Sequence, residues 1–339
     1  MAVSVIISNL NGARFLPRLL ETLEAQRGVE LEIIVVDRQS IDASAEILAQ
    51  HPQVIVVSEP PLTGLVSGYH RGTLAATKEH FFFINEDMWF DLDCLARLER
   101  QIDLSRRIGA ADPWQWTYDE ANWIHGVTRF VPVRWAINGV HPFRASDFNV
   151  DLPAGSIVPF ACAGACLIHR QVYEEVGGWD TSMFLDYEDI DFFLRAWQRG
   201  WRCVAVPDAK VYHAVGMSNP GASLNAPQKA GAGQRRYIAN CYGKTLIAWK
   251  LFSAPNALWI GSAIWLVMFA NNTLKLRWRI ASWDLAALRK CLSRLPEILA
   301  FRRANREFTR RHPGEQFFLQ PEFARSPKPV DAPDEERAT

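Results

Sequence analysis

The stretch VSVIISNLNGARFLPRLLETLEAQRGVELEIIVVD, residues 3–37, decides the fold class. It starts with the continuous apolar run Val3–Ile7 and ends with a second buried-strand pattern, Glu32–Asp37. Between the two runs, apolar residues recur at helical spacing and form one stripe: Phe15, Leu16, Leu19, Leu20 and Leu23. Strands that are apolar throughout are buried on both faces, as in a parallel sheet. The stretch therefore predicts strand, helix and strand of an α/β fold.

The same alternation continues to residue 87. Ser40 and Asp42 offer N-caps for a helix over residues 43–50, and a strand follows over residues 54–57. A Gly-containing loop and helix over residues 64–77 lead to the aromatic strand over residues 81–84. Four strands that alternate with helices predict a mainly parallel open sheet flanked by helices.

Polar residues follow three of these predicted strands, and ligands of open α/β sheets bind at the carboxyl ends of strands. The residues are Asn9 and Asn11, Asp37, and the run Asn85-Glu86-Asp87. Neither a G-x-G-x-x-G after the first strand nor a G-x-x-x-x-G-K-[ST] occurs, so the usual glycine-rich phosphate cradles are missing. A divalent metal on strand-end carboxylates is the substitute that this layout favours.

A second informative block spans residues 177–216. The acids Glu188, Asp189 and Asp191 stand at the start of a helical pattern, and a short apolar strand follows over Cys203–Val206. His213 comes just after a second strand-like run. Acids at a helix start and a histidine downstream can meet across one cleft. The simpler interpretation is a solvated acidic helix start, which the helix dipole stabilises. Ahead of this block, residues 160–170 are typical of a buried strand with small residues, whereas residues 109–159 have little periodicity.

Composition excludes little. Lys plus Arg and Asp plus Glu number 37 each, so the net charge gives no argument for nucleic acid. The six cysteines have no C-x-x-C spacing, which favours buried thiols in a reducing compartment over a zinc site. The N-terminus has no signal-peptide pattern, so we expect the body of the protein to be cytoplasmic.

The C-terminal third points to a membrane. Residues 251–274 carry no charge, and a helix of this length can span a bilayer core of ~30 Å. An interfacial helix and a buried core helix are the alternatives. Residues 275–311 then hold eleven Lys or Arg against three acids, with leucines at helical spacing and a kink expected at Pro296. A basic amphipathic helix suits an anionic membrane surface, although it could also pack on the preceding domain with a solvated basic face. We expect residues 326–339 to be disordered.

Five motifs in order resemble those of glycosyltransferase family two, with the GT-A fold, and most of all its bacterial rhamnosyltransferase-like branch. They are SVIISNLNG, VVDRQSIDAS, GLVSGYHRGTLAAT, FFFINEDMWF and the block from GACLIHR to QRGW. The resemblance extends from about Val3 to about Ser218. The chain departs from the family pattern at Leu10, at Arg38-Gln39, at His70 and in the order Asn85-Glu86-Asp87, which bears on the choice of donor.

The resemblance implies roles for individual residues. It places Asn9, Asn11 and Asp37 at the nucleotide base, with His70 and Glu86 also beside the nucleotide. It makes Asp87 and His213 ligands of Mg²⁺ or Mn²⁺. Asp189 is the implied general base, and Glu188 orients or binds the acceptor. Asp191 stays open between such a role and a helix cap.

The expected function is inverting, metal-dependent transfer of a sugar from a nucleotide-diphosphate donor. The acceptor would be a hydroxyl of a glycan or polyprenyl-linked glycan in cell-surface polysaccharide synthesis, with the protein attached peripherally or monotopically to the inner face of the cell membrane. A catalytically silent nucleotide-sugar-binding partner of a membrane complex is the alternative, and a nucleotidyltransferase is a third class that lacks its basic Gly-rich loop here. The expected domains are residues 1–245, divided at about residue 95 into a nucleotide half and an acceptor half that ends at residue 218, and a helical extension over residues 246–325.

Overall fold

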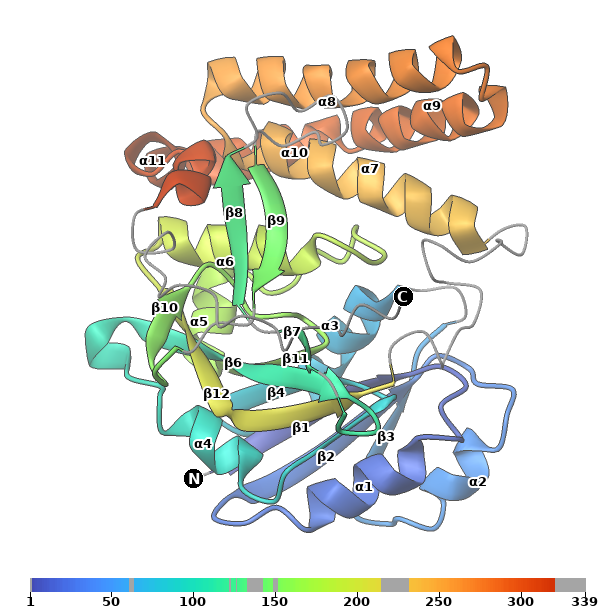
Figure 1. Cartoon of the computed structure of the whole chain (residues 1–339), viewed down its shortest axis with the longest axis vertical. Helices are drawn as coiled ribbons and strands as arrows, with labels where there is room; N and C mark the ends of the chain where they lie inside the picture. Colours follow the sequence, from blue (N-terminus) through green and yellow to red (C-terminus); the bar gives the residue numbers. More distant parts are fainter. Residues whose placement is uncertain are drawn as a thin grey trace, which may run out of the picture.

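The first four strands form one parallel layer, as expected from the sequence (Figure 1). The structure is a computed structural model that describes residues 2–60, 64–121, 123–125, 127–132, 143–148, 152–214 and 232–320. The layer has the order β3-β2-β1-β4, with β1 at Ala2–Asn9, β2 at Glu30–Asp37, β3 at Ile55–Ser58 and β4 at His80–Asn85. Three helices connect these strands: α1 (Leu16–Glu24), α2 (Ser44–Leu48) and α3 (Leu65–Ala75). The apolar stripe of α1 is buried, because it covers this layer.

The second half of the sheet is mixed, so the parallel arrangement predicted from the sequence holds only for the first half. β11 (Ala165–His169) is antiparallel to both β4 and β6 (Ile108–Thr117), and β12 (Arg202–His213) is parallel to β6. Two antiparallel pairings in succession restore the strand direction. The carboxyl end of β12 therefore lies at the same edge as that of β4.

Strand β12 is longer than the four residues predicted from the sequence. Its register against β6 shifts between Val206 and Lys210, where Pro207 has no N–H to donate to the ladder. The strand resumes after the shift and ends at His213, which pairs with Met88 of β5 (Met88–Phe90). The sequence showed two separate strand-like runs before His213, and the structure joins them across this irregularity into one strand that carries His213 to the edge of the sheet.

The segment with little periodicity forms strands. The central strand β6 is buried over most of its length, although prolines and tryptophans obscure its pattern. It is followed by β7 (Trp123–His125), by the two-stranded pair of β8 (Val127–Pro132) and β9 (Phe143–Phe148), and by β10 (Ser156–Val158). Strands β6 and β10 pair with strands distant in sequence, which local pattern does not reveal.

Helices α4 (Cys94–Glu99), α5 (Arg170–Val176) and α6 (Glu188–Gln198) complete the sheet-bearing body. One side of α6 packs into an aromatic cluster, in which Phe192 contacts Tyr173 and Trp179. All but one residue of α6 are buried, because the C-terminal helices cover its other side.

The C-terminal helices form a separate layer (Figure 1). They are α7 (Ala232–Leu251), α8 (Ala254–Leu274), α9 (Trp278–Ser293), α10 (Leu295–Ala304) and α11 (Arg306–Arg311), followed by a 3₁₀ turn at Gly314–Leu319. The interruption expected near Pro296 occurs at Arg294, with the proline in the first turn of α10. The domain boundary expected at residue 246 falls inside α7, and the division stays a prediction. The tail over residues 326–339 lies outside the described residues.

Among the described residues, one helix is long and apolar enough to cross a membrane, judged by length and composition alone, and that helix is α8. Only 18% of its most apolar window is buried, which argues against the interpretation as a buried core helix. It packs along α7 and α9 on one side only.

Candidate active site

The ends of β1 and β2 are joined through side chains. Asn9 Nδ2 donates to Asp37 Oδ1 at 2.9 Å and to Ser40 Oγ at 3.0 Å, and Ser40 Oγ also donates to Asp37 Oδ1 at 2.6 Å. Asn9 is fully buried, and its Oδ1 has no hydrogen-bond partner among the described residues. The arrangement fixes the Asp37 carboxylate at the carboxyl end of the sheet, where ligands of such sheets bind.

Asn11 and Asp42 hold the two loops that follow these strands. Asn11 adopts a left-handed backbone with φ 57°, its N–H donates to Ser40 Oγ, and its Oδ1 accepts from Ile41 N–H. Asp42 accepts from Ala13 N–H and from Ser44 at the start of α2. The N-cap of α2 is Ala43, so Asp42 lies one residue before the N-cap position that the sequence predicted for it. Ser40, the other predicted N-cap, bonds to Asp37 instead.

Glu86 is buried directly after β4, with an exposed fraction of 7%. Burial raises the pKa of Glu86 to about 7, and the Asp87 carboxylate adds to the rise while Arg38 opposes it. Arg38 is therefore one of the site residues that the sequence pattern missed, although the unusual Arg38-Gln39 pair was visible.

Asp87 and His213 meet at this edge of the sheet. His213 Nε2 lies 3.2 Å from Asp87 Oδ1, and the Asp87 carboxylate is 5% exposed. The opposite ring nitrogen, Nδ1, lies 3.2 Å from Gln115 Oε1 of β6. An amide oxygen at Nδ1 favours a proton on that nitrogen, which leaves the Nε2 lone pair directed at the carboxylate. The Asp87 carboxylate and His213 Nε2 are therefore close enough to bind one cation together. Gln115 had no signal in the sequence.

This donor set fits Mg²⁺ or Mn²⁺. A carboxylate oxygen and an imidazole nitrogen both bind Mn²⁺, and Mg²⁺ is usually held by one or two protein ligands with phosphate oxygens and water in the other positions. The described residues contain no group of three or more His, Cys, Asp or Glu that could hold a metal. Asp87 and His213 would therefore share the ion with the oxygens of a bound diphosphate.

His70 is not brought into this cluster by any contact among the described residues. It lies on α3, where its carbonyl accepts from Thr73 Oγ1, and its Nδ1 is buried without a described hydrogen-bond partner. The neighbouring Tyr69 points inward instead and donates to Asn85 Oδ1 at 2.7 Å. The role given to His70 stays a prediction.

The residues Asp186–Asp189, which we call the α6 turn, carry the second group of acids. Asp186 and Tyr187 both have positive φ, 66° and 73°. Such a backbone costs about 1–3 kcal/mol per non-glycine residue and persists only where the surroundings impose it. Arg236 of α7 contacts both carboxylate oxygens of Asp186 at 3.2 Å, and Gly243 of α7 lies against Tyr187. Helix α7 therefore holds the turn in a conformation that the turn would not keep alone.

Glu188 and Asp189 follow this strained backbone. Glu188 is 6% exposed and its Oε2 has no described hydrogen-bond partner; burial and the neighbouring Asp189 raise the pKa of Glu188 well above its usual range. Asp189 is partly exposed, and its Oδ1 accepts from Ile190 N–H at 2.7 Å, as an acid in the first turn of a helix does. The turn thus presents the partly exposed Asp189 beside the buried carboxyl of Glu188.

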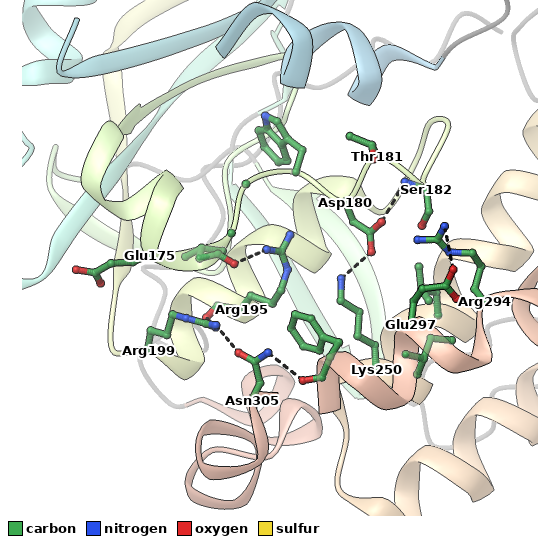
Figure 2. Close-up of a pocket in the computed structure, with 17 residues that line it drawn as sticks. Glu175, Asp180, Thr181, Ser182, Arg195, Arg199, Lys250, Arg294, Glu297 and Asn305 are labelled. Carbon is green, nitrogen blue, oxygen red and sulfur yellow. Dashed lines mark hydrogen bonds and ion pairs between the residues drawn. The ribbon is translucent and has the colours of Figure 1, made fainter. Parts of the chain in front are cut away.

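Asp191 belongs to a buried ion cluster, so the helix-cap interpretation is wrong: the N-cap of α6 is Tyr187. Asp191 accepts from Arg195 Nε at 2.8 Å and from Lys250 of α7 at 2.9 Å. Lys250 also contacts Asp180 at 2.7 Å (Figure 2). Burial alone would raise the pKa of Asp180, but Lys250 outweighs it and holds that pKa well below its usual range. The cluster lines a cavity of about 420 Å³ between α6 and the C-terminal helices.

The two groups of acids approach each other at Tyr69. Burial raises the pKa of this phenol, and Glu86 and Glu188 are both among the nearby groups that add to the rise. The backbones also touch, because Leu65 N–H at the start of α3 donates to the carbonyl of Phe184 just before the α6 turn. A side chain at Gly64 would collide with that same backbone. The strand-end cluster (Asn9, Asp37, Glu86, Asp87 and His213) and the α6 turn therefore form one site.

Comparison with known proteins agrees with this layout. The family model described as glycosyl transferase family 2 matches residues 4–177, just over half of the chain. The uncharacterized glycosyltransferase YwdF of Bacillus subtilis is 24% identical over 234 residues, which cover 68% of this chain and 81% of YwdF. The N-acetylglucosaminyl-diphospho-decaprenol L-rhamnosyltransferase of Mycobacterium tuberculosis is 36% identical over 72 residues, only 20% of this chain and 24% of that protein.

The fold is shared with solved structures at low identity. GalNAc-T7, crystallised with UDP, GalNAc and Mn²⁺, has a TM-score of 0.60 at 15% identity, covering 92% of this chain and 58% of that one. This likeness shows the fold, a mixed α/β sheet flanked by helices. The similarity in sequence supports the rhamnosyltransferase resemblance over a short segment only.

Proposed function

This chain belongs to glycosyl transferase family 2, and on that premise we propose that it transfers a sugar from a nucleotide-diphosphate donor to a hydroxyl group with inversion. The observation that supports the reaction most strongly is the pairing of Asp87 with His213 at the sheet edge that also holds Asp37. A diphosphate leaving group needs a cation there, and the α6 turn supplies a carboxylate for the attacking hydroxyl.

Each end of the site has its own task. Asp37, fixed by Asn9, accepts hydrogen bonds from the nucleotide base, and Asn11 keeps the adjoining loops in place. Asp87 and His213 would hold Mg²⁺ or Mn²⁺, which supplies positive charge to the leaving diphosphate. Glu86 and the buried Arg38 beside it adjust the charge next to that ion.

Asp189 acts as the general base. As the acceptor oxygen attacks the anomeric carbon, its proton moves to the Asp189 carboxylate, and the bond from that carbon to the phosphate oxygen breaks with its electron pair on the diphosphate. One displacement with one base inverts the anomeric configuration. Glu188, a buried carboxyl whose pKa burial and Asp189 raise, lies next to Asp189 in the turn and orients or binds the acceptor.

The acceptor that we propose is a glycan or polyprenyl-linked glycan used in cell-surface polysaccharide synthesis. The short similarity to a rhamnosyltransferase that acts on a decaprenol-linked sugar supports this class, as does the exposed apolar helix α8. The protein would then work at the inner face of the cell membrane.

A donor screen tests the proposal. Thermal shift and release of nucleoside diphosphate are measured with dTDP-rhamnose and a set of UDP-sugars, each with Mn²⁺, with Mg²⁺ or with EDTA. We expect one nucleotide sugar to raise the melting temperature and to be turned over only with the metal. Binding without turnover in the presence of lipid-linked acceptors would instead identify a silent binding partner.

A further inference from the structure

A basic groove lies at the base of the C-terminal layer. The arginine groove is a cavity of about 520 Å³ bordered by Arg302 and Arg303 of α10 and by Arg306 and Arg310 at α11. The other residues that line it are neutral, and two of them, Ser253 and Ala254, begin α8. No acid is among the described residues that form its walls.

The positive charge of the groove is not neutralised within the described part of the chain. Arg303, Arg306 and Arg310 are exposed, and none of them makes an ion pair with a described residue. The nearby Glu307 pairs with Arg311, while Glu315 binds Ser253 and Asn256. The groove therefore attracts anions.

Arg302 is already held in position. Its Nη1 donates to the carbonyls of Trp249 at 2.8 Å and Phe252 at 2.9 Å, at the end of α7. These bonds satisfy carbonyls that a helix end leaves without partners, and they fix the guanidinium at the rim. A cation that is fixed in this way loses little entropy when an anion binds.

An exposed apolar face begins beside the groove. On α8, Leu258 and Trp259 are 72% and 75% exposed, and Leu266 and Val267 continue the same face. The opposite face is closely packed, since a side chain at Gly261 would meet the ring of Trp249. At the far end, Leu274, Leu276 and Trp278 are also exposed. Tryptophan at both ends of an apolar face is typical of the boundary between lipid and water.

We propose that the arginine groove binds the phosphate groups of anionic phospholipids while the outer face of α8 enters the boundary between head groups and acyl chains. The proposal rests on the membrane attachment inferred above and assigns it a site. Nucleic acid or an acidic protein would satisfy the arginines but would leave the apolar face of α8 in water, and contiguous apolar surface of this kind marks an interaction site. A lipid surface satisfies both features at once.

The test is co-sedimentation of the full chain with phosphatidylcholine vesicles, with and without phosphatidylglycerol. The triple variant Arg303→Gln/Arg306→Gln/Arg310→Gln removes three exposed charges and leaves Arg302 in place. Its control, Arg27→Gln/Arg100→Gln/Arg106→Gln, removes three exposed charges from the sheet-bearing body, away from the C-terminal layer. Because each arginine near an anionic surface contributes about 1 kcal/mol, or about fivefold in affinity, we expect the groove variant to bind phosphatidylglycerol vesicles about 100-fold more weakly, with the control unchanged.

A second variant, Leu258→Ala/Trp259→Ala, is expected to weaken binding to both kinds of vesicle. The proposal is overturned if the groove variant binds like the wild type, if the control loses as much affinity, or if sedimentation velocity shows that α8 is covered by a second copy and vesicles are not bound. Turnover of soluble donor and acceptor is measured on the same proteins without vesicles. If the wild-type protein binds vesicles but does not turn over donor and acceptor, the glycosyltransferase proposal is contradicted and the groove assignment stands.

Discussion

In the strand-end cluster, Asn9, Asp37 and Asp87 stand at the carboxyl ends of neighbouring strands and are fixed by the sheet itself. In the α6 turn, Asp186 and Tyr187 hold left-handed backbone conformations that Arg236 and Gly243 of α7 impose from a separate layer. In the proposed function, donor binding would thus depend on the sheet, whereas the placement of the base would depend on the C-terminal helices. Damage to the two regions should therefore have different consequences.

The largest effect is expected from Asp189→Asn. Because general-base catalysis contributes about 10²–10⁴-fold, turnover should fall by that factor while the thermal shift with donor and metal is kept. Initial rates of diphosphate release measure it. The control Glu46→Gln makes the same kind of change at an exposed position on α2 and should turn over like the wild type. Near-normal turnover of Asp189→Asn would remove Asp189 from the mechanism.

Lys250→Met should destabilise the junction between the two layers. It leaves Asp191 and Asp180 buried without their shared cation, and breaking a buried pair in this way costs about 3–5 kcal/mol. Denaturant unfolding measures the loss. Adding Asp180→Asn should restore part of it, because Lys250 is the cation that pairs with Asp180 among the described residues, whereas Asp191 keeps its ion pair with Arg195. If Lys250→Met alone unfolds like the wild type, the cluster does not hold the layers together.

Glu86→Gln should give a pH-dependent gain in stability. The pKa of Glu86 lies above its unfolded value of 4.5, at about 7, so the folded state binds the proton more tightly. The stability that this proton provides is complete below about pH 4.5 and is lost as pH rises through 7, a difference of about 3 kcal/mol. The neutral glutamine avoids that loss.

Melting temperatures of the metal-free proteins, measured from acid to mildly alkaline pH, test this prediction. The Gln variant should be more stable than the wild type at about pH 8, and the two should converge in acid. A difference that does not depend on pH would show that Glu86 is ionised throughout.

Arg236→Gln is expected to have the smallest effect. The contact with Asp186 is partly exposed, so the fold should lose little stability. The α6 turn should nevertheless relax toward ordinary backbone angles, which would lower kcat several-fold without changing the thermal shift with donor. A weaker donor shift together with an unchanged kcat would contradict the separation of the two regions.

The strand-end cluster was largely predictable from the sequence, because buried strands and the acids that follow them are adjacent in the chain. Asp37, Asp87 and the edge they share follow from that local pattern. His213 was placed through family resemblance, and its second partner Gln115 was missed because the pairing of β6 with β12 joins residues almost a hundred positions apart.

For the α6 turn, the sequence predicted only that acidic residues stand at the start of a helix. The acids Glu188, Asp189 and Asp191 were visible, but their different environments were not. Asp191 became an ion-pair partner because Lys250, about sixty residues later, reaches it from α7. The strain at Tyr187 likewise comes from packing against α7, which no window of local sequence contains.

The most direct test of the account compares donor binding and turnover in Asp87→Asn and Asp189→Asn with the donor identified by the screen. Asp87→Asn should lose both the metal-dependent thermal shift and turnover, whereas Asp189→Asn should keep the shift and lose turnover alone. If Asp189→Asn loses the shift, or if Asp87→Asn keeps metal-dependent turnover, the division of the site into a donor end and a base end is wrong.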